Sequence, residues 1–213
     1  GSVGGFQALE WSRMSSSRIK NMILLACGAR VTPWLGAFNE TMRMALHADP
    51  TFEAQEYDLA DGKAVAKGGK RGLAAARALA LISYRSYTGY LTTQPETDED
   101  TMWCTRVGSY QQYQGKKLVD RFDAYSYNSM VYITDSHNVG RRRGGVEAAL
   151  KQVKANCICV GIDSDGLFPV EEQKFIASCI PGAKYHEITS KFGHDGFLLE
   201  NDQLTAIIEP LLP

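Results

Sequence analysis

The sequence predicts an α/β protein in which a parallel sheet is wrapped by helices and interrupted by a long helical insertion. Two continuous apolar runs, at 19–29 and 157–162, have the composition of strands buried on both faces, and a weaker third run lies at 183–188. Amphipathic segments with helical spacing separate these runs, and such alternation indicates parallel pairing. The segment between 36 and 140 has a mainly helical pattern.

The N-terminal segment combines a helix with the first strand. Residues 6–14 follow a run of glycines and predict a helix. The run "IKNMILLACGA" at 19–29 is apolar on both faces and ends near a glycine, which is typical of a buried strand. We therefore assign residues 1–35 to the core.

The insertion shows helical spacing in three places. These are "FNETMRMAL" at 38–46, "GLAAARALALISYRSYTGYL" at 72–91, and the tyrosine-rich "LVDRFDAYSYNSMVYITD" at 118–135. The apolar stripes of the first two comprise Phe38, Met42, Ala45 and Leu46, then Leu73, Ala76, Ala80, Tyr84, Tyr87 and Leu91. An acidic, proline-bearing loop at 92–101 lies between the second and third segments. We expect a helical insertion at 36–145.

The C-terminal segment, 146–213, returns to strand–helix alternation and completes the predicted core. Helices are expected at 171–180 and 201–212. Their apolar faces comprise Phe175, Ile176 and Cys179 in the first, and Leu204, Ile207, Ile208 and Leu211 in the second. A doubly wound sheet typically has about five or six strands. Three strands are too few, so we expect this chain to be the C-terminal part of a larger α/β protein.

Composition limits the classes of partner. The 213 residues are 44% hydrophobic and 22% charged, as in an ordinary globular protein, and the net charge is −1. This balance favours neither nucleic acid nor an anionic membrane as a partner. The five cysteines are an odd number and mostly lie in apolar runs, so we expect reduced thiols, no metal site and an intracellular, cytoplasmic protein. Neither a bilayer-spanning run nor a signal segment is apparent, so we expect no membrane association.

The first residues, "GSVGG", pose a choice. Ser2, Val3 and Gly4 supply the S-x-G half of a nucleophile elbow, G-x-S-x-G, in which a serine is exposed at the start of a helix. Gly1-Ser2 is also what a cleaved expression tag leaves behind, and on this pattern alone a tag remnant or flexible terminus is the better interpretation. The downstream residues change that balance.

An acid and a histidine follow the serine in the order that α/β-hydrolases use, each after a strand. The segment "GIDSDGLFP" at 161–169 places Asp163 and Asp165 at the end of the second strand. The segment "SKFGHDGFLLE" at 190–200 places His194 in a glycine-flanked loop after the third. The spacing alone does not separate Asp163 from Asp165.

Several longer motifs closely resemble the homoserine O-acetyltransferase family of α/β-hydrolase-fold acyltransferases. They are "GSVGGFQALEW", "AFNE", "GLAAARALALISYRS", "RFDAYSY", "SHNVGR", "SDGLFPVEEQ" and "GHDGFLLE". The resemblance runs from residue 1 to near the C-terminus and implies an α/β-hydrolase fold with a helical lid. Three positions depart from the family pattern, because Val3 and Phe6 stand where methionine is usual and Gly196 where alanine is common.

By motif, the resemblance implies a catalytic triad of Ser2 as nucleophile, Asp165 as acid and His194 as base. Histidine takes the proton from the poorly nucleophilic serine hydroxyl, and the acid holds the imidazole in the right tautomer. The backbone N–H of Val3 is the oxyanion donor that this chain supplies. Losing the second such donor, whose loop lies outside the chain, costs about 3–4 kcal/mol.

The resemblance also implies how a substrate is recognised. Arg85, in the "YR" motif, is expected to bind the carboxylate of L-homoserine, and Asp195 its amine. Acetyl-CoA, as co-substrate, would acylate the serine, and homoserine would accept the acetyl group in a ping-pong scheme of methionine biosynthesis, with no bound cofactor or metal. We expect the lid to exclude water and to form a homodimer surface.

Alternatives remain at each step. An arginine on a helix, such as Arg85, is more often solvated or salt-bridged than a ligand, and Asp195 is compatible with a cap of the final helix. The tyrosine-rich stretch 125–132 is compatible with lid packing or with a dimer surface. Succinyl-CoA as donor, L-serine as acceptor and a non-catalytic fragment are the alternative interpretations. A plain esterase would leave Arg85 and Asp195 without a purpose. His47, His137 and His186 are interpreted as structural.

Overall fold

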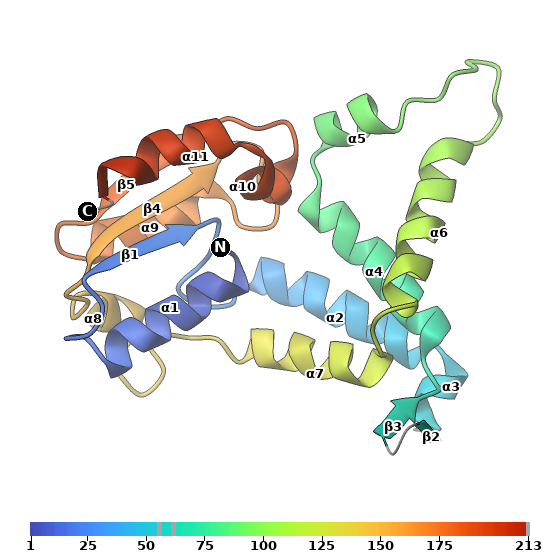
Figure 1. The fold of residues 1–213 in the computed structure, drawn as a ribbon, viewed down its shortest axis with the longest axis horizontal. Helices are drawn as coiled ribbons and strands as arrows, with labels where there is room; N and C mark the ends of the chain where they lie inside the picture. Colours follow the sequence, from blue (N-terminus) through green and yellow to red (C-terminus); the bar gives the residue numbers. More distant parts are fainter. Residues whose placement is uncertain (55–56, 61–62, 212–213) are drawn as a thin grey trace. The chain divides into compact units, whose positions relative to one another are not determined.

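A computed structural model describes residues 1–54, 57–60 and 63–211, and the chain divides into two compact units (Figure 1). We call them the sheet unit and the helical unit. The sheet unit comprises Gly1–Thr32, Tyr84–Ser86 and Ser136–Pro213, and the helical unit comprises Pro33–Ser83 and Tyr87–Asp135.

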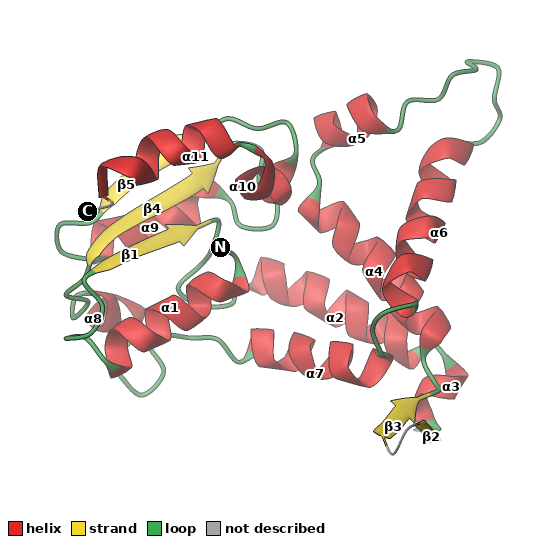
Figure 2. Cartoon of the chain, viewed as in Figure 1, coloured by secondary structure: helices red, strands yellow, loops and turns green. Residues whose placement is uncertain are grey.

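The sheet unit contains the three predicted strands. They are β1 (Asn21–Leu25), β4 (Asn156–Ile162) and β5 (Lys184–Ile188), in the order β1-β4-β5 and parallel throughout (Figure 2). The register places Leu24 beside Cys159. The expectation of a parallel sheet built from these runs is confirmed.

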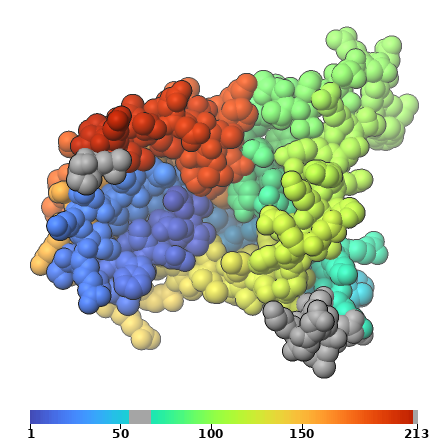
Figure 3. All heavy atoms as spheres, viewed as in Figure 1, coloured from blue at the N-terminus to red at the C-terminus, as the bar shows by residue number. Residues whose placement is uncertain are grey.

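Helices cover both faces of the sheet. They are α1 (Val3–Met14), α8 (Val146–Leu150), α9 (Val170–Cys179), α10 (Gly196–Leu199) and α11 (Asn201–Ile208), with 3-10 turns at Gly193–Asp195 and Glu209–Leu211. Successive strand residues face opposite sides. One side therefore presents Ile158, Val160 and Ile162 to Leu204 of α11, and the other presents Cys159 and Gly161 toward α1 and α9. In the space-filling view, the N-terminal residues (blue) adjoin the C-terminal helices (red) of this unit (Figure 3).

The face of α9 differs from the one the sequence predicts. Ile176 is fully buried as expected, but it shares its face with Gln173, while Phe175 is 38% exposed. Gln173 is buried because its Nε2 donates to the carbonyl of Cys27, two residues after β1 ends, 2.9 Å away. A pattern based on hydrophobicity could not predict the burial of Gln173, because it does not register a polar side chain that hydrogen-bonds another element. In α11, by contrast, Leu204, Ile207 and Ile208 pack together as predicted.

The helical unit is mainly helical, as predicted. Its helices are α2 (Pro33–His47), α3 (Pro50–Glu53), α4 (Lys70–Tyr84), α5 (Tyr87–Thr93), α6 (Thr105–Val119) and α7 (Ala124–Asp135). Close packing occurs at two glycines, since a Cβ on Gly72 would lie 2.8 Å from Leu46 of α2, and one on Gly115 would lie 2.8 Å from the carbonyl of Ala74. The unit also contains an antiparallel pair, β2 (Tyr57–Ala60) and β3 (Lys63–Ala66), that the helical interpretation did not anticipate.

The segment 72–91 was expected to follow one helical stripe, but it forms two helices. The chain leaves helical geometry at Arg85 and Ser86, between α4 and α5. Beyond this break Tyr87 is 80% and Leu91 55% exposed, so the stripe does not continue as a buried face. The break belongs to the sheet unit, and it carries one of the predicted substrate-binding residues.

Among the described residues, no helix is both long and apolar enough to cross a bilayer.

Candidate active site

Ser2 lies at the entrance of helix α1 in a strained backbone conformation. Its φ is 48° and its ψ −130°, in the region that residues with a side chain rarely adopt. Such strain costs on the order of 1–3 kcal/mol and persists only where the surroundings impose it. Here the Ser2 N–H donates to the carbonyl of Leu25 at the end of β1, 3.0 Å away. A serine strained in this way at the start of a helix fits a nucleophile elbow, and a flexible terminus would not require the strain.

The glycines around Ser2 allow close packing, although not where the motif suggests. A Cβ on Gly1 would lie 2.8 Å from the ring of Phe197, and one on Gly5 would lie 2.5 Å from Sγ of Cys27. A Cβ on Gly4 would have nothing within 4 Å. Close approach of α1 to the sheet therefore depends on Gly5, one residue after the glycine that completes S-x-G.

The first turn of α1 contains the predicted oxyanion donor. The N–H groups of Gly4 and Gly5 donate to the carbonyls of Gly1 and Ser2, at 2.9 and 2.7 Å. Val3, the first helical residue, has no intrahelical acceptor for its N–H, as is general for the first turn of a helix. This N–H and the helix dipole both favour negative charge beside Ser2.

Asp165 and His194 form a buried pair. The Nδ1 of His194 lies 2.8 Å from Oδ2 of Asp165, and the residues are 4% and 5% exposed. The other carboxylate oxygen accepts the N–H groups of Leu167 and Phe168, at 2.8 and 2.9 Å. A carboxylate held in this way fixes both the ring orientation and the tautomer of a histidine, leaving Nε2 as the nitrogen that can accept a proton.

Asp163, the alternative that the spacing left open, has a different role. Its carboxylate accepts the N–H of Ser190, 3.0 Å away, in the loop that carries His194. The structure thus pairs Asp165, and not Asp163, with the histidine.

The imidazole of His194 is surrounded by aromatic rings. The ring centroids of Phe168 and Phe197 lie 5.3 Å from it, and that of Tyr84 lies 6.0 Å away. Phe197 is also the ring that approaches Gly1. Phe197 therefore lies close both to the imidazole of His194 and to Gly1, the residue before Ser2.

Arg85 and Asp195 form an ion pair within the sheet unit. The guanidinium Nη1 lies 2.8 Å from the Asp195 carboxylate, and the two side chains are 28% and 21% exposed. The pair exists because the break between α4 and α5 packs on the histidine loop, where Gly193 has φ 67° and a Cβ would lie 2.7 Å from the carbonyl carbon of Arg85. Asp195 occupies the N-cap position of α10 without a side-chain hydrogen bond to that helix, and its carboxylate pairs with Arg85.

His137 is a buried residue that packs behind the elbow. Its ring stacks on Phe6 of α1, with centroids 3.9 Å apart and an angle of 11°. Burial lowers the pKa of His137, although a hydrogen bond with the backbone of Gly28 opposes this effect. Its Nε2 is buried and has no partner within the part of the chain that the structure describes. Phe6, one of the departures from the family pattern, thus has a ring partner that sequence alone did not reveal.

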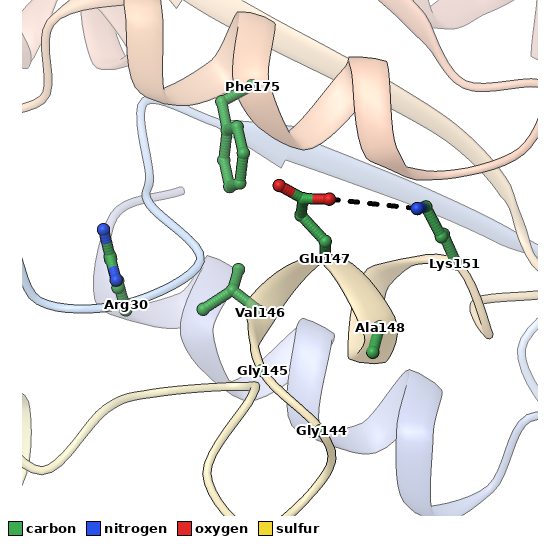
Figure 4. Close-up of a pocket in the computed structure, with 8 residues that line it drawn as sticks. All are labelled: Arg30, Gly144, Gly145, Val146, Glu147, Ala148, Lys151 and Phe175. Atoms are coloured by element: carbon green, nitrogen blue, oxygen red, sulfur yellow. Dashed lines mark ion pairs between the residues drawn. The ribbon is translucent and has the colours of Figure 1, made fainter.

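The cysteines and a surface groove contribute no residue to this site. The Sγ atoms of Cys157 and Cys159 lie 3.8 Å apart on one strand face, all five thiols are free, and burial raises the pKa of Cys27 to about 12. Across the described ranges, no group of three or more histidine, cysteine or acidic side chains could hold a metal. A surface groove of about 560 Å³ includes the Glu147–Lys151 ion pair in its lining (Figure 4). It is lined by Arg30, Gly144, Gly145, Val146, Glu147, Ala148, Lys151 and Phe175.

Known proteins resemble the chain in sequence and in fold. Curated homoserine O-acetyltransferases from Cyclobacterium marinum and Thermus thermophilus are each 40% identical to the chain, over 98% and 100% of its length. The chain is a homologue of the homoserine O-acetyltransferases. The solved homoserine O-acetyltransferase of Staphylococcus aureus aligns with 98% of the chain at a TM-score of 0.76 and 28% identity. No protein-family model matches the chain.

The resemblance seen in the motifs and the predicted fold class, the α/β-hydrolase fold, are therefore confirmed. The chain spans about half the length of the curated relatives that it matches, 57% of the first and 52% of the second. It likewise covers 55% of the solved Staphylococcus aureus protein.

Proposed function

We propose that this chain carries the catalytic residues of an acyltransferase that moves an acetyl group from acetyl-CoA to the hydroxyl of L-homoserine. The observation that carries the proposal is the buried Asp165–His194 pair, 2.8 Å between nitrogen and oxygen, together with the strained Ser2 at the start of α1. The homology to proteins named homoserine O-acetyltransferase supports the reaction class.

The proposed reaction has two steps. His194 Nε2 removes the proton of the Ser2 hydroxyl as its oxygen attacks the thioester carbonyl, and the protonated imidazole then returns that proton to the leaving thiolate. The homoserine hydroxyl next attacks the acetyl-serine, again with His194 as base, which frees Ser2 and completes a ping-pong cycle. The Val3 N–H stabilises the oxyanion in both steps.

Arg85 and Asp195 are proposed to bind the carboxylate and the ammonium group of L-homoserine. A guanidinium binds a carboxylate in fork geometry, and a carboxylate binds an ammonium. The two side chains pair with each other in this structure. A zwitterion offers a partner to each, so its binding exchanges one ion pair for two and leaves neither charge unpaired. A ligand with only one of the two charges would leave either Arg85 or Asp195 without an ionic partner.

We also propose which cofactors, cellular compartment, assembly and pathway the protein has. The chemistry requires neither a metal nor a bound cofactor, because the nucleophile, base and oxyanion donor are all protein groups. The free thiols of all five cysteines support a reducing, cytoplasmic compartment. A homodimer formed through the helical unit, and a place in methionine biosynthesis, follow from the family resemblance.

The test is acylation of Ser2. The chain is incubated with acetyl-CoA or succinyl-CoA, and intact mass is measured with and without homoserine or serine. We expect an acetyl adduct that is absent in Ser2→Ala and that homoserine discharges. A fusion of the chain behind the N-terminal half of the Thermus thermophilus relative is tested in parallel. No adduct in either form would refute the proposal, whereas an adduct in the fusion alone assigns the isolated chain to a non-catalytic fragment.

A further inference from the structure

Side chains of the loop that carries Asp165 hydrogen-bond the backbone of the loop that carries His194. We define the histidine loop as residues 189–196 and the acid loop as residues 163–168. Asp163 accepts the N–H of Ser190 at 3.0 Å, near the start of the histidine loop. A second side chain, Ser164, binds the histidine loop at two points.

The hydroxyl of Ser164 acts as acceptor and donor at once. Its Oγ accepts the N–H of Gly193, 3.0 Å away, and donates to the carbonyl of Ser190. A hydroxyl has one proton and two lone pairs, so both bonds are compatible with one rotamer. Ser164 therefore spans the turn between Ser190 and Gly193 and closes it.

The two hydrogen bonds of Ser164 lie next to the Asp165–His194 pair. Ser164 directly precedes Asp165, and Gly193 directly precedes His194, so the hydroxyl joins the two loops one residue away from each partner of the pair. On its other side, Gly193 packs against the backbone of Arg85 and Ser86, and the Ser86 hydroxyl donates to the carbonyl of Lys191. The backbone that carries the imidazole is thus clamped between the acid loop and the α4–α5 break.

We propose that Ser164 is a positioning residue for His194. Its hydroxyl sets the distance between the two loops, and through it the orientation of the imidazole relative to the Asp165 carboxylate. The inference rests on the proposed function, in which His194 is the base. Because displacement of about 1 Å at a catalytic group costs on the order of 100-fold in rate, we expect Ser164→Ala to lower acyl transfer by roughly that factor.

The experiment compares four variants of the chain and of the fusion described above. Ser164→Ala removes the hydroxyl, Ser164→Cys nearly keeps the volume but weakens both hydrogen bonds, and Ser164→Thr retains them. Ser178→Ala is the matched control, since Ser178 also donates to a backbone carbonyl, that of Phe175 on α9. Two readouts are taken: the downfield NMR resonance of the His194 Nδ1 proton together with the pKa of His194, and the pH–rate profile of Ser2 acylation.

We expect the Nδ1 resonance to broaden or disappear and the pH profile to shift in the alanine and cysteine variants, with both readouts unchanged in Ser164→Thr and Ser178→Ala. Folded alanine and cysteine variants with unaltered His194 signals would overturn the proposal. So would the loss of folding in both variants by circular dichroism, since Ser164 would then serve the fold as a whole. If the NMR effect appears but Ser2 is never acylated, the proposed function fails while the positioning role stands.

Discussion

Two buried aspartates, one in each unit, show what distinguishes a structural carboxylate from one arranged for chemistry. Asp165 in the sheet unit and Asp49 in the helical unit are both 5% exposed. In each, one oxygen accepts two backbone N–H groups within the chain, which compensates for the loss of water. The second oxygen makes the difference.

The second oxygen of Asp49 is used by its own helix cap, accepting the N–H and hydroxyl of Thr51 at 3.0 and 2.7 Å. Asp49 thus joins the starts of α3 and α4. Burial would raise its pKa, but the hydrogen bonds from Gly72, Thr51 and Arg71 outweigh burial, and the pKa lies below its ordinary value. The second oxygen of Asp165 instead binds a titratable group, His194. A buried carboxylate with a titratable partner indicates chemistry, whereas one saturated by backbone donors indicates a cap.

The strongest test of this contrast is Asp165→Asn. We expect acyl transfer to fall by about 10⁴-fold, because an amide stabilises the wrong tautomer of His194. Asp163→Asn is the matched control, because it makes the same change two residues away, where the amide oxygen can still accept the Ser190 N–H. Transfer rates of both variants are measured on folded protein, and equal losses would show that Asp165 has no special role.

Removing the charge of Asp195 from the Arg85–Asp195 ion pair is expected to have the next largest effect. Asp195→Asn should raise the KM for homoserine by roughly 10- to 100-fold, as expected for a charged hydrogen bond of about 1.5–3 kcal/mol. Hydrolysis of a neutral aryl acetate, which offers no ammonium, should be nearly unaffected. If both substrates lose activity equally, Asp195 supports the catalytic loop and does not select the substrate.

Asp49→Ala should act on stability alone. Loss of the cap is expected to lower the free energy of unfolding by about 2 kcal/mol near pH 7, with the rate per folded molecule unchanged. The folded-state pKa of Asp49 is depressed, so its contribution is present above the unfolded pKa and is lost as the pH falls through the folded value. The difference between variant and unmodified protein in urea melts should therefore shrink below about pH 4. A constant difference across that range contradicts this account.

The smallest effect is expected from His137, whose buried ring hydrogen-bonds the backbone of Gly28. Its folded-state pKa is lowered by burial, so the unfolded chain binds its proton more readily and stability falls as the pH drops below about 6.5. His137→Phe keeps the stack on Phe6 but removes the titration. We expect a lower stability at every pH, through loss of the Gly28 hydrogen bond, and a shallower decline between pH 7 and 5. An unchanged slope would assign that decline to other groups.

Several features of the sheet unit followed directly from the sequence. The three runs became the three parallel strands. The run at 157–162 was the clearest, since β4 is buried on both faces and must be apolar along its length, which is a local property. The order of serine, acid and histidine could also be predicted, because the acid and the histidine come after the serine and each follows a strand. The helical stripe at 72–91 was less informative, because helical spacing on both sides of Arg85 and Ser86 concealed the break between α4 and α5.

By itself, the sequence determined the fold class, the strands and the residue types of the site, since periodicity and motif spacing are properties of neighbouring residues. Only the tertiary structure decided which aspartate meets His194, that Ser2 is strained, and that Arg85 pairs with Asp195. Asp163 and Asp165 lie two residues apart after the same strand, and their local patterns do not separate them. Their roles depend on atoms 27 and 29 residues further along the chain, which the fold brings within 3.0 Å.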